Sequence, residues 1–355
     1  MKEGGGLREI RSLTAIRGIA ALWVVTHHFR PHLECVSPAL GSIFNGYMGY
    51  TGVDIFFVLS GFILTLVYAD LTRSGLKDFA LRRVMRIYPL HLTVLAVMAA
   101  TAFIPGFWPG YLIDWHDLPA QVLLLQPYLG RSLFEWNSPS WSAGVELFCY
   151  LLFPAALLLL RRLPLAALLL LVVLAGCAEW QVQTCYAGIW GGWGSVARGL
   201  AGFGLGMAVQ LAALRWRAPR RGVIAVEVLA AVTLVAAALG RDAQVIPLAA
   251  AGLIWALAYE AGPVARVLRG RIPVYLGEIS FSIYMIHQPL IAAYAWAWPN
   301  DWGSPMFLVR KAGYFVLLIA LASLTYRLIE RPARRLWRVE KAVGGVGVAP
   351  GLRLT

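Results

Sequence analysis

Charged residues are scarce in this sequence, and acidic ones are outnumbered by basic ones. Only 14% of the 355 residues are charged and 59% are hydrophobic, whereas a soluble domain is about half apolar and a quarter charged. This composition indicates a chain whose outer surface faces lipid. The net charge of +13 would suggest a nucleic acid partner in a soluble protein. Here basic inner loops explain the charge, so we expect no nucleic acid partner.

Several catalytic motifs are also missing. There is no GxSxG nucleophile elbow, because Ser60-Gly61 lacks the leading glycine, and there is no Walker loop. The six histidines lack metal-ligand spacing, so we expect no metal. The four cysteines suggest no disulfide framework, and free thiols are expected even at Cys177 and Cys185, whose spacing would allow pairing. Around Arg17, the first apolar stretch lacks a small-residue cleavage site, which indicates a helix rather than a removed signal peptide.

Long apolar stretches dominate the rest of the chain. A membrane-spanning helix needs roughly 20 mostly apolar residues. A further stretch, 118–130, is short and contains Pro119 and Pro127, so we expect it to be re-entrant or interfacial. The predicted spans are 13–29, 50–69, 87–104, 143–160, 163–180, 197–214, 223–240, 244–260, 280–299 and 307–328.

Loop charge supports ten spans with both termini inside. Most of the 31 Lys and Arg residues then fall in inner segments, as the positive-inside rule demands. We therefore predict an all-α polytopic bundle in a bacterial inner membrane, with a membrane domain at 8–338. Flexible tails are expected at 1–7 and 339–355, with no appended soluble domain. The basic residues predicted outside are Arg30, Arg131, Arg198, Arg241, Arg310 and Lys311.

Ionisable residues inside the predicted spans are functional candidates, because burying charge in lipid is expensive. Arg17 and His28 are eleven residues apart, which places them within about 20° of one helix face and about 16 Å apart along the axis. Asp54 and Glu146 each lie one turn into a helix that enters from outside. His28, Asp54 and Glu146 are therefore predicted to lie at one depth in the membrane. A histidine beside a carboxylate suits a general base with its orienting partner, while a structural ion pair is the alternative explanation.

Two further pairs have helical spacing. Arg83 and Arg86 precede the third predicted span, and a spacing of three places both guanidinium groups on one helix face, which suits phosphate binding. Ordinary inner-loop charge is the alternative explanation. Tyr284 and His287 have the same spacing in the ninth span, nearer the cytoplasm. Glu330 ends the last span among arginines and is expected to form a salt bridge.

Together these segments resemble the acyltransferase 3 family of integral membrane acyltransferases over about residues 8–338. Two positions depart from the family pattern: Thr14 stands where the family usually has an aspartate, and Ala143 where it has leucine. The resemblance rests on an ordered set of motifs. They are Arg17 followed by ten residues and His28, GYTGVDIFFVLSGFIL at 49–64, RRVMRIYPLH at 82–91, PSWSAGVELFCYLLFP at 139–154, SFSIYMIHQPL at 280–290 and LIERPARR at 328–335.

The resemblance implies transfer of an acyl group, usually acetyl, from acyl-coenzyme A to a hydroxyl. Acceptors in the family include lipopolysaccharide, exopolysaccharide and, in some branches, macrolides. The implied partners are acyl-coenzyme A, a hydroxyl acceptor and membrane lipid. We expect His28 to be the general base, supported by Arg17, Glu146 and Asp54. The residues expected to bind the donor are Arg83, Arg86, Tyr284 and His287.

Two alternatives remain at this stage. A transporter of protons or an organic solute would use His28, Asp54 and Glu146 as a relay. The Arg83–Arg86 pair discriminates, because a transporter needs no clamp for coenzyme phosphates. Within the acyltransferase interpretation, direct transfer is preferred since no activated Ser or Cys is evident, and an acyl-enzyme on His28 stays open.

Overall fold

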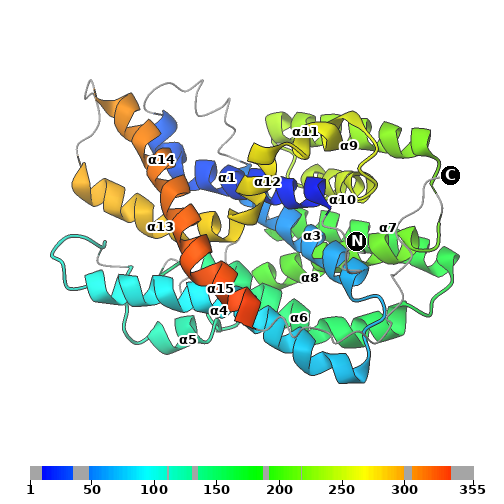
Figure 1. The fold of residues 1–355 in the computed structure, drawn as a ribbon, viewed down its shortest axis with the longest axis horizontal. Coiled ribbons are helices and arrows are strands. Elements are labelled where there is room, and N and C mark those ends of the chain that lie inside the picture. The colour runs from blue at the N-terminus through cyan, green and yellow to red at the C-terminus, as the bar shows by residue number, and fades with distance from the viewer. Residues whose placement is uncertain are drawn as a thin grey trace, which may run out of the picture.

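The protein is a bundle of α-helices (Figure 1). The computed structural model describes residues 10–34, 48–109, 112–129, 135–186, 192–216, 218–299 and 306–336. No β-strand occurs in these ranges. The tails predicted at 1–7 and 339–355 and the thiol of Cys35 lie outside the described residues. Cys149, Cys177 and Cys185 are free thiols, as expected.

Each of the ten predicted stretches is a helix in the structure. Short elements connect them: η1 (Gly49–Thr51), η2 (Arg73–Gly75), α5 (Leu118–Val122), α11 (Pro263–Leu268), α12 (Arg271–Glu278), the π-helix η3 (Tyr326–Glu330) and α15 (Arg331–Leu336). The long helices are α1 (Arg11–Glu34), α3 (Gly52–Val67), α4 (Leu76–Thr101), α6 (Ser140–Leu160), α7 (Leu165–Tyr186), α8 (Gly192–Ala213), α9 (Arg220–Gly240), α10 (Val245–Leu257), α13 (Ser280–Ala297) and α14 (Phe307–Thr325).

Seven helical segments in the described residues are long and apolar enough to cross a membrane. They contain α3, α4, α6, α7, α8, α9 and α14. The helix α10 has 13 residues, about 20 Å at 1.5 Å per residue, which is shorter than a bilayer core of about 30 Å. The helices α1 and α13 carry the polar candidates Arg17, His28 and His287. The chain is thus a multi-pass helical bundle whose most polar long helices carry candidate site residues.

Two local expectations concern the third predicted span and the segment after it. Residues 118–129, the described part of the stretch 118–130, contain only the five-residue helix α5 followed by turns, so they do not form a spanning helix. The helix α4 begins at Leu76, whereas the span was predicted to begin at 87. Arg83 and Arg86 therefore lie within a helix and not in a loop before it. Asp78 in the first turn and its ion pair with Arg82 favour this earlier start.

Burial separates the helices that face lipid from those in the centre. The most apolar windows of α3 and α8 are each 72% buried, whereas those of α7 and α9 are 11% and 22% buried. Large apolar side chains on the outer helices are exposed; for example, Leu159 is 73% exposed and Leu229 is 67% exposed. Many exposed large apolar side chains on long helices indicate contact with a membrane or another protein. On helices of this length and composition, lipid is the natural environment.

Glycines allow α3 and α8 to pack with their backbones in contact. A Cβ atom on Gly61 would overlap the carbonyl of Phe203, and one on Gly206 would overlap the carbonyl of Val58. Small residues at helix crossings are how membrane helices approach closely, because lipid gives no hydrophobic force between them. This contact fixes the register of α8 against α3.

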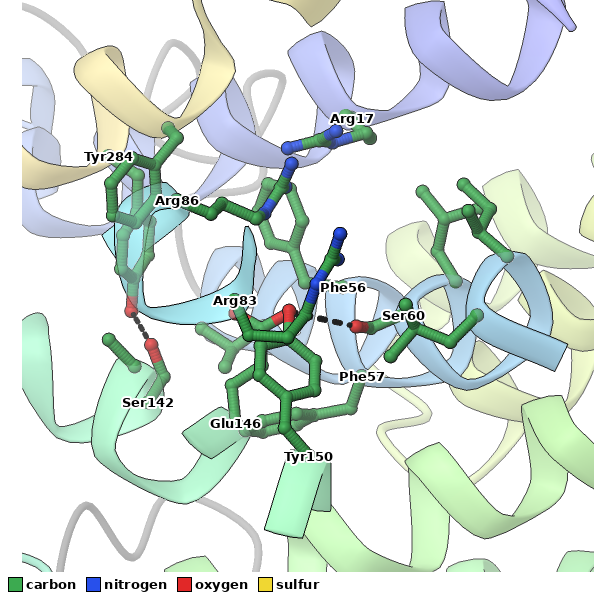
Figure 2. A pocket seen from close by; sticks show the side chains of 16 residues that line it. Arg17, Phe56, Phe57, Ser60, Arg83, Arg86, Ser142, Glu146, Tyr150 and Tyr284 are labelled. Carbon is green, nitrogen blue, oxygen red and sulfur yellow. Dashed lines mark hydrogen bonds between the residues drawn. The ribbon is translucent and has the colours of Figure 1, made fainter. Parts of the chain in front are cut away.

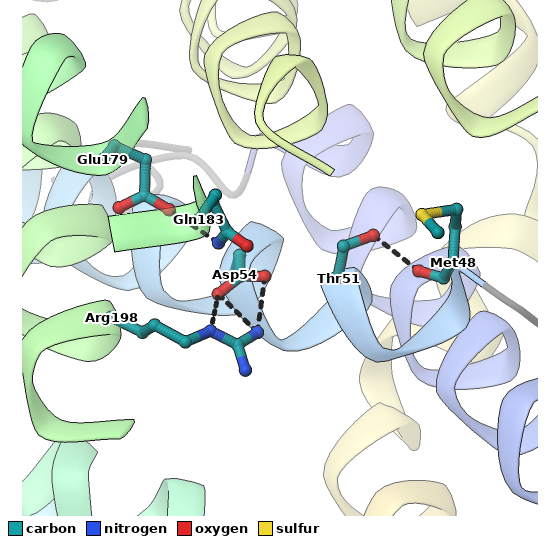
Figure 3. Close-up of polar contacts among 6 residues, drawn as sticks. All are labelled: Met48, Thr51, Asp54, Glu179, Gln183 and Arg198. Carbon is teal, nitrogen blue, oxygen red and sulfur yellow. Dashed lines mark hydrogen bonds and ion pairs between the residues drawn. The ribbon is translucent and has the colours of Figure 1, made fainter. Parts of the chain in front are cut away.

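That register brings Asp54 of α3 to Arg198 of α8 (Figure 3). The Arg198 Nη2 atom lies 2.7 Å from Asp54 Oδ2, its Nε lies 3.2 Å from Oδ1, and both side chains are fully buried. The rings of Tyr50 and Trp141 lie 5.6 and 6.0 Å from the guanidinium carbon. The expectation that Asp54 orients His28 does not fit this geometry, because both Asp54 oxygens bind the guanidinium. The structural ion pair is the correct reading of Asp54.

We predict that breaking this pair destabilises the fold. Asp54→Asn or Arg198→Gln should each cost about 3–5 kcal/mol, because each leaves an uncompensated buried charge. Replacing both residues should cost less than the sum of the single changes. Thermal unfolding in detergent measures these effects.

The exposed Asp78–Arg82 pair provides the matched control. Its N–O distance is 2.8 Å and its side chains are 37% and 32% exposed, so Asp78→Asn should cost only about 0.3–0.5 kcal/mol. Equal destabilisation by Asp54→Asn and Asp78→Asn would contradict a structural role for the buried pair.

Candidate active site

One cavity inside the bundle collects most of the predicted site residues (Figure 2). It lies between α1, α3, α4, α6 and α13. The centres of water molecules could occupy about 90 Å³ of it, which is room for several waters. Its wall is apolar apart from a few converging polar groups. The predicted residues that line it are Arg17, Arg83, Arg86, Glu146 and Tyr284.

Three arginines face this cavity from two helices. Arg17 comes from α1, which packs closely on α12. At the contact Gly18 has no side chain, and a Cβ atom there would overlap the backbone of Leu276 and Gly277. Arg83 and Arg86 come from one face of α4. In Figure 2 the three guanidinium groups point toward the same space. A buried cavity with several fixed cations is suited to an anion.

Arg83 is enclosed by aromatic rings. Its guanidinium carbon lies 5.7 Å from the ring of Tyr68, 5.9 Å from Phe79 and 5.5 Å from Tyr150. Its Nη2 donates to the Tyr68 hydroxyl at 3.5 Å. Its Nε atom is buried and has no hydrogen-bond partner. Buried donors almost always have a partner, so we expect a water or a ligand atom at this one.

Glu146 supplies negative charge to the cavity. Its Oε1 atom accepts a hydrogen bond from Ser60 Oγ at 2.8 Å and another from the hydroxyl of Tyr150, one turn further along α6. Its charge also acts on Arg17 and Arg86. The sequence-based hypothesis placed Glu146 against His28, but the hydrogen bonds of the carboxylate go to Ser60 and Tyr150. Neither of those two residues was predicted, although the spacing of Glu146 and Tyr150 offered a signal.

A pair of histidines lies beside the cavity and does not line it. His28 Nδ1 lies 3.2 Å from His287 Nε2 and 3.1 Å from the carbonyl of Val24. The sequence assigned His287 to the donor site, nearer the cytoplasm than His28. The contact instead puts both rings at one depth, because α13 crosses α1 with His287 against His28.

The hydrogen bonds of the pair fix where its protons lie. His287 Nδ1 is 2.6 Å from the carbonyl of Tyr284, so this nitrogen carries hydrogen and Nε2 accepts. His28 Nδ1 must then be the donor, shared between His287 Nε2 and the Val24 carbonyl. This assignment, which follows from the network, leaves the lone pair of neutral His28 on Nε2. An imidazole held this way can take a proton.

Tyr284 joins the histidines to the cavity. Its side chain lines the cavity, and its backbone carbonyl holds His287. Its hydroxyl donates to the carbonyl of Pro139 at 3.0 Å and is 2.8 Å from Ser142 Oγ. These bonds tie α13 to the start of α6. Tyr284 therefore connects the wall of the cavity to the histidine pair.

Basic side chains near the end of the described residues also act electrostatically on this site. Arg334 of α15 acts electrostatically on Arg17, Arg83 and Arg86. Glu330, predicted to form a salt bridge, pairs with Arg334 and accepts from Ser282 Oγ at 2.9 Å. The prediction for Glu330 is confirmed, and its partner lies within reach of the cavity arginines.

Comparison with known proteins identifies the family of this chain. The sequence matches the acyltransferase domain family over residues 10–327. It is 29% identical to the acyltransferase MdmB of Streptomyces mycarofaciens, with 92% of each chain covered. It is 28% identical to the exopolysaccharide production protein ExoZ of Rhizobium meliloti (strain 1021), covering 84% of this chain and 94% of that one.

A third relative is longer. The putative peptidoglycan O-acetyltransferase YrhL of Bacillus subtilis (strain 168) is 26% identical over 92% of this chain, which spans 55% of its length. No solved structure matches the chain significantly. The family match covers nearly the whole helical bundle, including each residue that lines the cavity. The chain therefore belongs to the acyltransferase domain family and is a membrane acyltransferase.

Proposed function

We propose that this protein moves an acyl group, most simply acetyl, from acyl-coenzyme A on the cytoplasmic side of a bacterial inner membrane to a hydroxyl of a carbohydrate acceptor. The observation that carries the proposal is the cavity with Arg17, Arg83 and Arg86 on its wall. Like charges gathered in a water-poor site repel one another. Among the residues that line the cavity, Glu146 is the carboxylate that offsets these three charges. An anion between the arginines would stabilise them further, and a diphosphate is an anion that guanidinium groups bind in a bidentate way.

The transporter alternative accounts for fewer of these residues. A relay through His28, Asp54 and Glu146 requires the three side chains to exchange protons. Asp54 is instead bound on both oxygens to Arg198, and Glu146 binds Ser60 and Tyr150. In an acyltransferase with an anionic donor, the arginines of the cavity would bind that donor. The family of the chain agrees with an acyltransferase.

In the proposed reaction, the acceptor hydroxyl loses its proton to His28 Nε2 as its oxygen attacks the carbonyl carbon of the thioester. The carbon–sulfur bond then breaks, and the sulfur leaves as the thiol of coenzyme A after taking the proton back from His28. His287 is a positioning residue in this scheme, since its Nε2 holds the His28 Nδ1–H. Arg17 contributes positive charge on the donor side, and Glu146 balances the arginines.

Carbohydrate is the preferred acceptor class because two relatives are named for exopolysaccharide production and for O-acetylation of peptidoglycan. A small secondary metabolite is the second candidate. An acceptor screen with the purified protein and radiolabelled acetyl-coenzyme A separates the two classes by the product that becomes labelled.

We predict that Arg83→Ala and Arg86→Ala each weaken acetyl-coenzyme A binding at least about tenfold. Hydrogen bonds to charged groups contribute about 1.5–3 kcal/mol, and 1.4 kcal/mol corresponds to a factor of ten. Isothermal titration of the detergent-purified protein measures the effect.

Arg82→Ala is the matched control on the same helix, because Arg82 pairs with Asp78 at a half-exposed position outside the cavity. Its binding should equal that of the wild type. If Arg82→Ala weakens binding as much as Arg83→Ala, general surface charge is responsible, and the phosphate assignment is wrong.

We predict that His28→Ala lowers kcat by a factor of about 10²–10⁴, the range for loss of a general base, while donor binding stays intact. His287→Ala should lower kcat less, leave KM for the donor unchanged and alter the pH profile, because the His28 tautomer is no longer held. His287→Gln should restore part of the loss, since its amide oxygen accepts the Nδ1–H bond.

His116→Ala is the control for the histidine pair, because His116 is exposed and lies outside both the cavity and the pair. Acyl transfer by this variant should match the wild type. Unchanged turnover in His28→Ala would exclude His28 as the base.

A further inference from the structure

A second group of arginines lies outside the cavity, at the end of the described chain. Arg327, Arg331, Arg334 and Arg335 follow one another through η3 and α15; we call them the C-terminal arginine cluster. Two open clefts of about 310 and 420 Å³ lie against them. Arg331 and Arg335 line both clefts, and both residues are exposed.

The fold holds this cluster against the helix that carries the donor arginines. Both η3 and α15 pack on α4, and Figure 1 shows α15 crossing α4. Glu330, 1% exposed, anchors the turn through Ser282 of α13 and through Arg334. The π-helical turn just before α15 changes the register at which the arginines emerge, and such turns are common at functional sites.

Positive charge is in excess along this path. The carboxylates that act on Arg17, Arg86 and Arg334 in the described part of the chain are Glu146 and Glu330. Arg334 lies between the two groups, since its charge acts on Arg83 and Arg86. One basic region therefore runs from the buried cavity to the open clefts. It suits a ligand that carries phosphate at two separate places.

We propose that Arg331 and Arg335 bind the ribose 3′-phosphate of the coenzyme A donor. This inference rests on the proposed function, in which the cavity arginines hold the diphosphate. Coenzyme A carries a diphosphate between its pantetheine arm and adenosine, and a separate phosphate on the ribose. The arm and the diphosphate enter the buried site, while the ribose phosphate stays at the open clefts. The cluster thereby selects free coenzyme A thioesters over donors that lack this phosphate, such as an acyl group on carrier-bound phosphopantetheine.

The test compares two donors that differ only in this phosphate, acetyl-coenzyme A and acetyl-dephospho-coenzyme A. Binding of each is measured at one ionic strength for wild type, for the double variant Arg331→Gln, Arg335→Gln, and for the control Arg220→Gln, Arg221→Gln. The control residues are exposed arginines at the start of α9. We expect wild type and control to prefer acetyl-coenzyme A at least about tenfold. In the Arg331, Arg335 variant the preference should fall to about one, with binding of the dephospho donor unchanged, which also shows that the variant is folded.

Three results would overturn the proposal. Equal weakening of both donors in the Arg331, Arg335 variant would indicate general electrostatics. No preference between the donors in wild type would leave the ribose phosphate without a site. Stabilisation of wild type by anionic phospholipid vesicles that is lost in the variant, with the donor preference retained, would assign the clefts to lipid headgroups. Failure of the proposed function looks different, because wild type would then bind neither donor.

Discussion

Lipid cannot solvate a charge, so each ionised side chain inside this bundle must be neutralised by protein or by a ligand. This constraint separates the buried polar residues into two groups. Asp54 and Arg198 satisfy each other, with both carboxylate oxygens bound to one guanidinium and both side chains fully buried. Arg83 is different, since its buried Nε lacks a hydrogen-bond partner. The first arrangement is complete within the protein, whereas the second leaves a buried donor over. The difference supports a structural role for the Asp54–Arg198 pair and makes Arg83 a candidate for ligand binding.

The packing of the helices makes this separation possible. Backbone contact between α3 and α8 through Gly61 and Gly206 sets the register of the Asp54–Arg198 pair. A different face of α3 carries Ser60, which donates to Glu146, so one helix supports both the ion pair and the cavity. The contact of α1 with α13 brings His28 to His287. Each contact lies between segments far apart in the chain, and in each case small or polar residues replace the large apolar ones that face lipid.

Much of this architecture could be predicted from the sequence. The ten apolar stretches are helices because their length and composition leave few other options in a membrane. Five of the eight predicted site residues line one cavity. Contacts between helices could not be predicted, because periodicity reports which face of a helix is apolar and not which helix lies opposite. Asp54 was therefore assigned to His28, and His287 to the donor. One signal for the ion pair was present in the sequence and was missed. Arg198 and Asp54 both lie near the outer ends of their predicted spans, where ionised groups need partners. Glu179, fully buried on α7 with a hydrogen bond from Gln183, lies at the outer end of its predicted span and carried the same signal.

The chemistry of the donor explains why a membrane acyltransferase would keep its arginines and its base apart. Coenzyme A is highly charged at the nucleotide end and neutral along the pantetheine arm. Only the neutral arm can pass deeper into the bundle than the arginines, so the phosphates must stop where the protein provides cations. In the proposed mechanism Arg17, Arg83 and Arg86 provide that stop, and His28 lies beyond Tyr284, about 16 Å along α1 from Arg17. The acyl group can then meet an acceptor from the other side although neither charged substrate crosses the membrane. A base beside the phosphates would require the acceptor hydroxyl to pass through the whole bundle. Transfer between substrates on opposite sides of the membrane thus requires His28 to lie at a distance from the arginines.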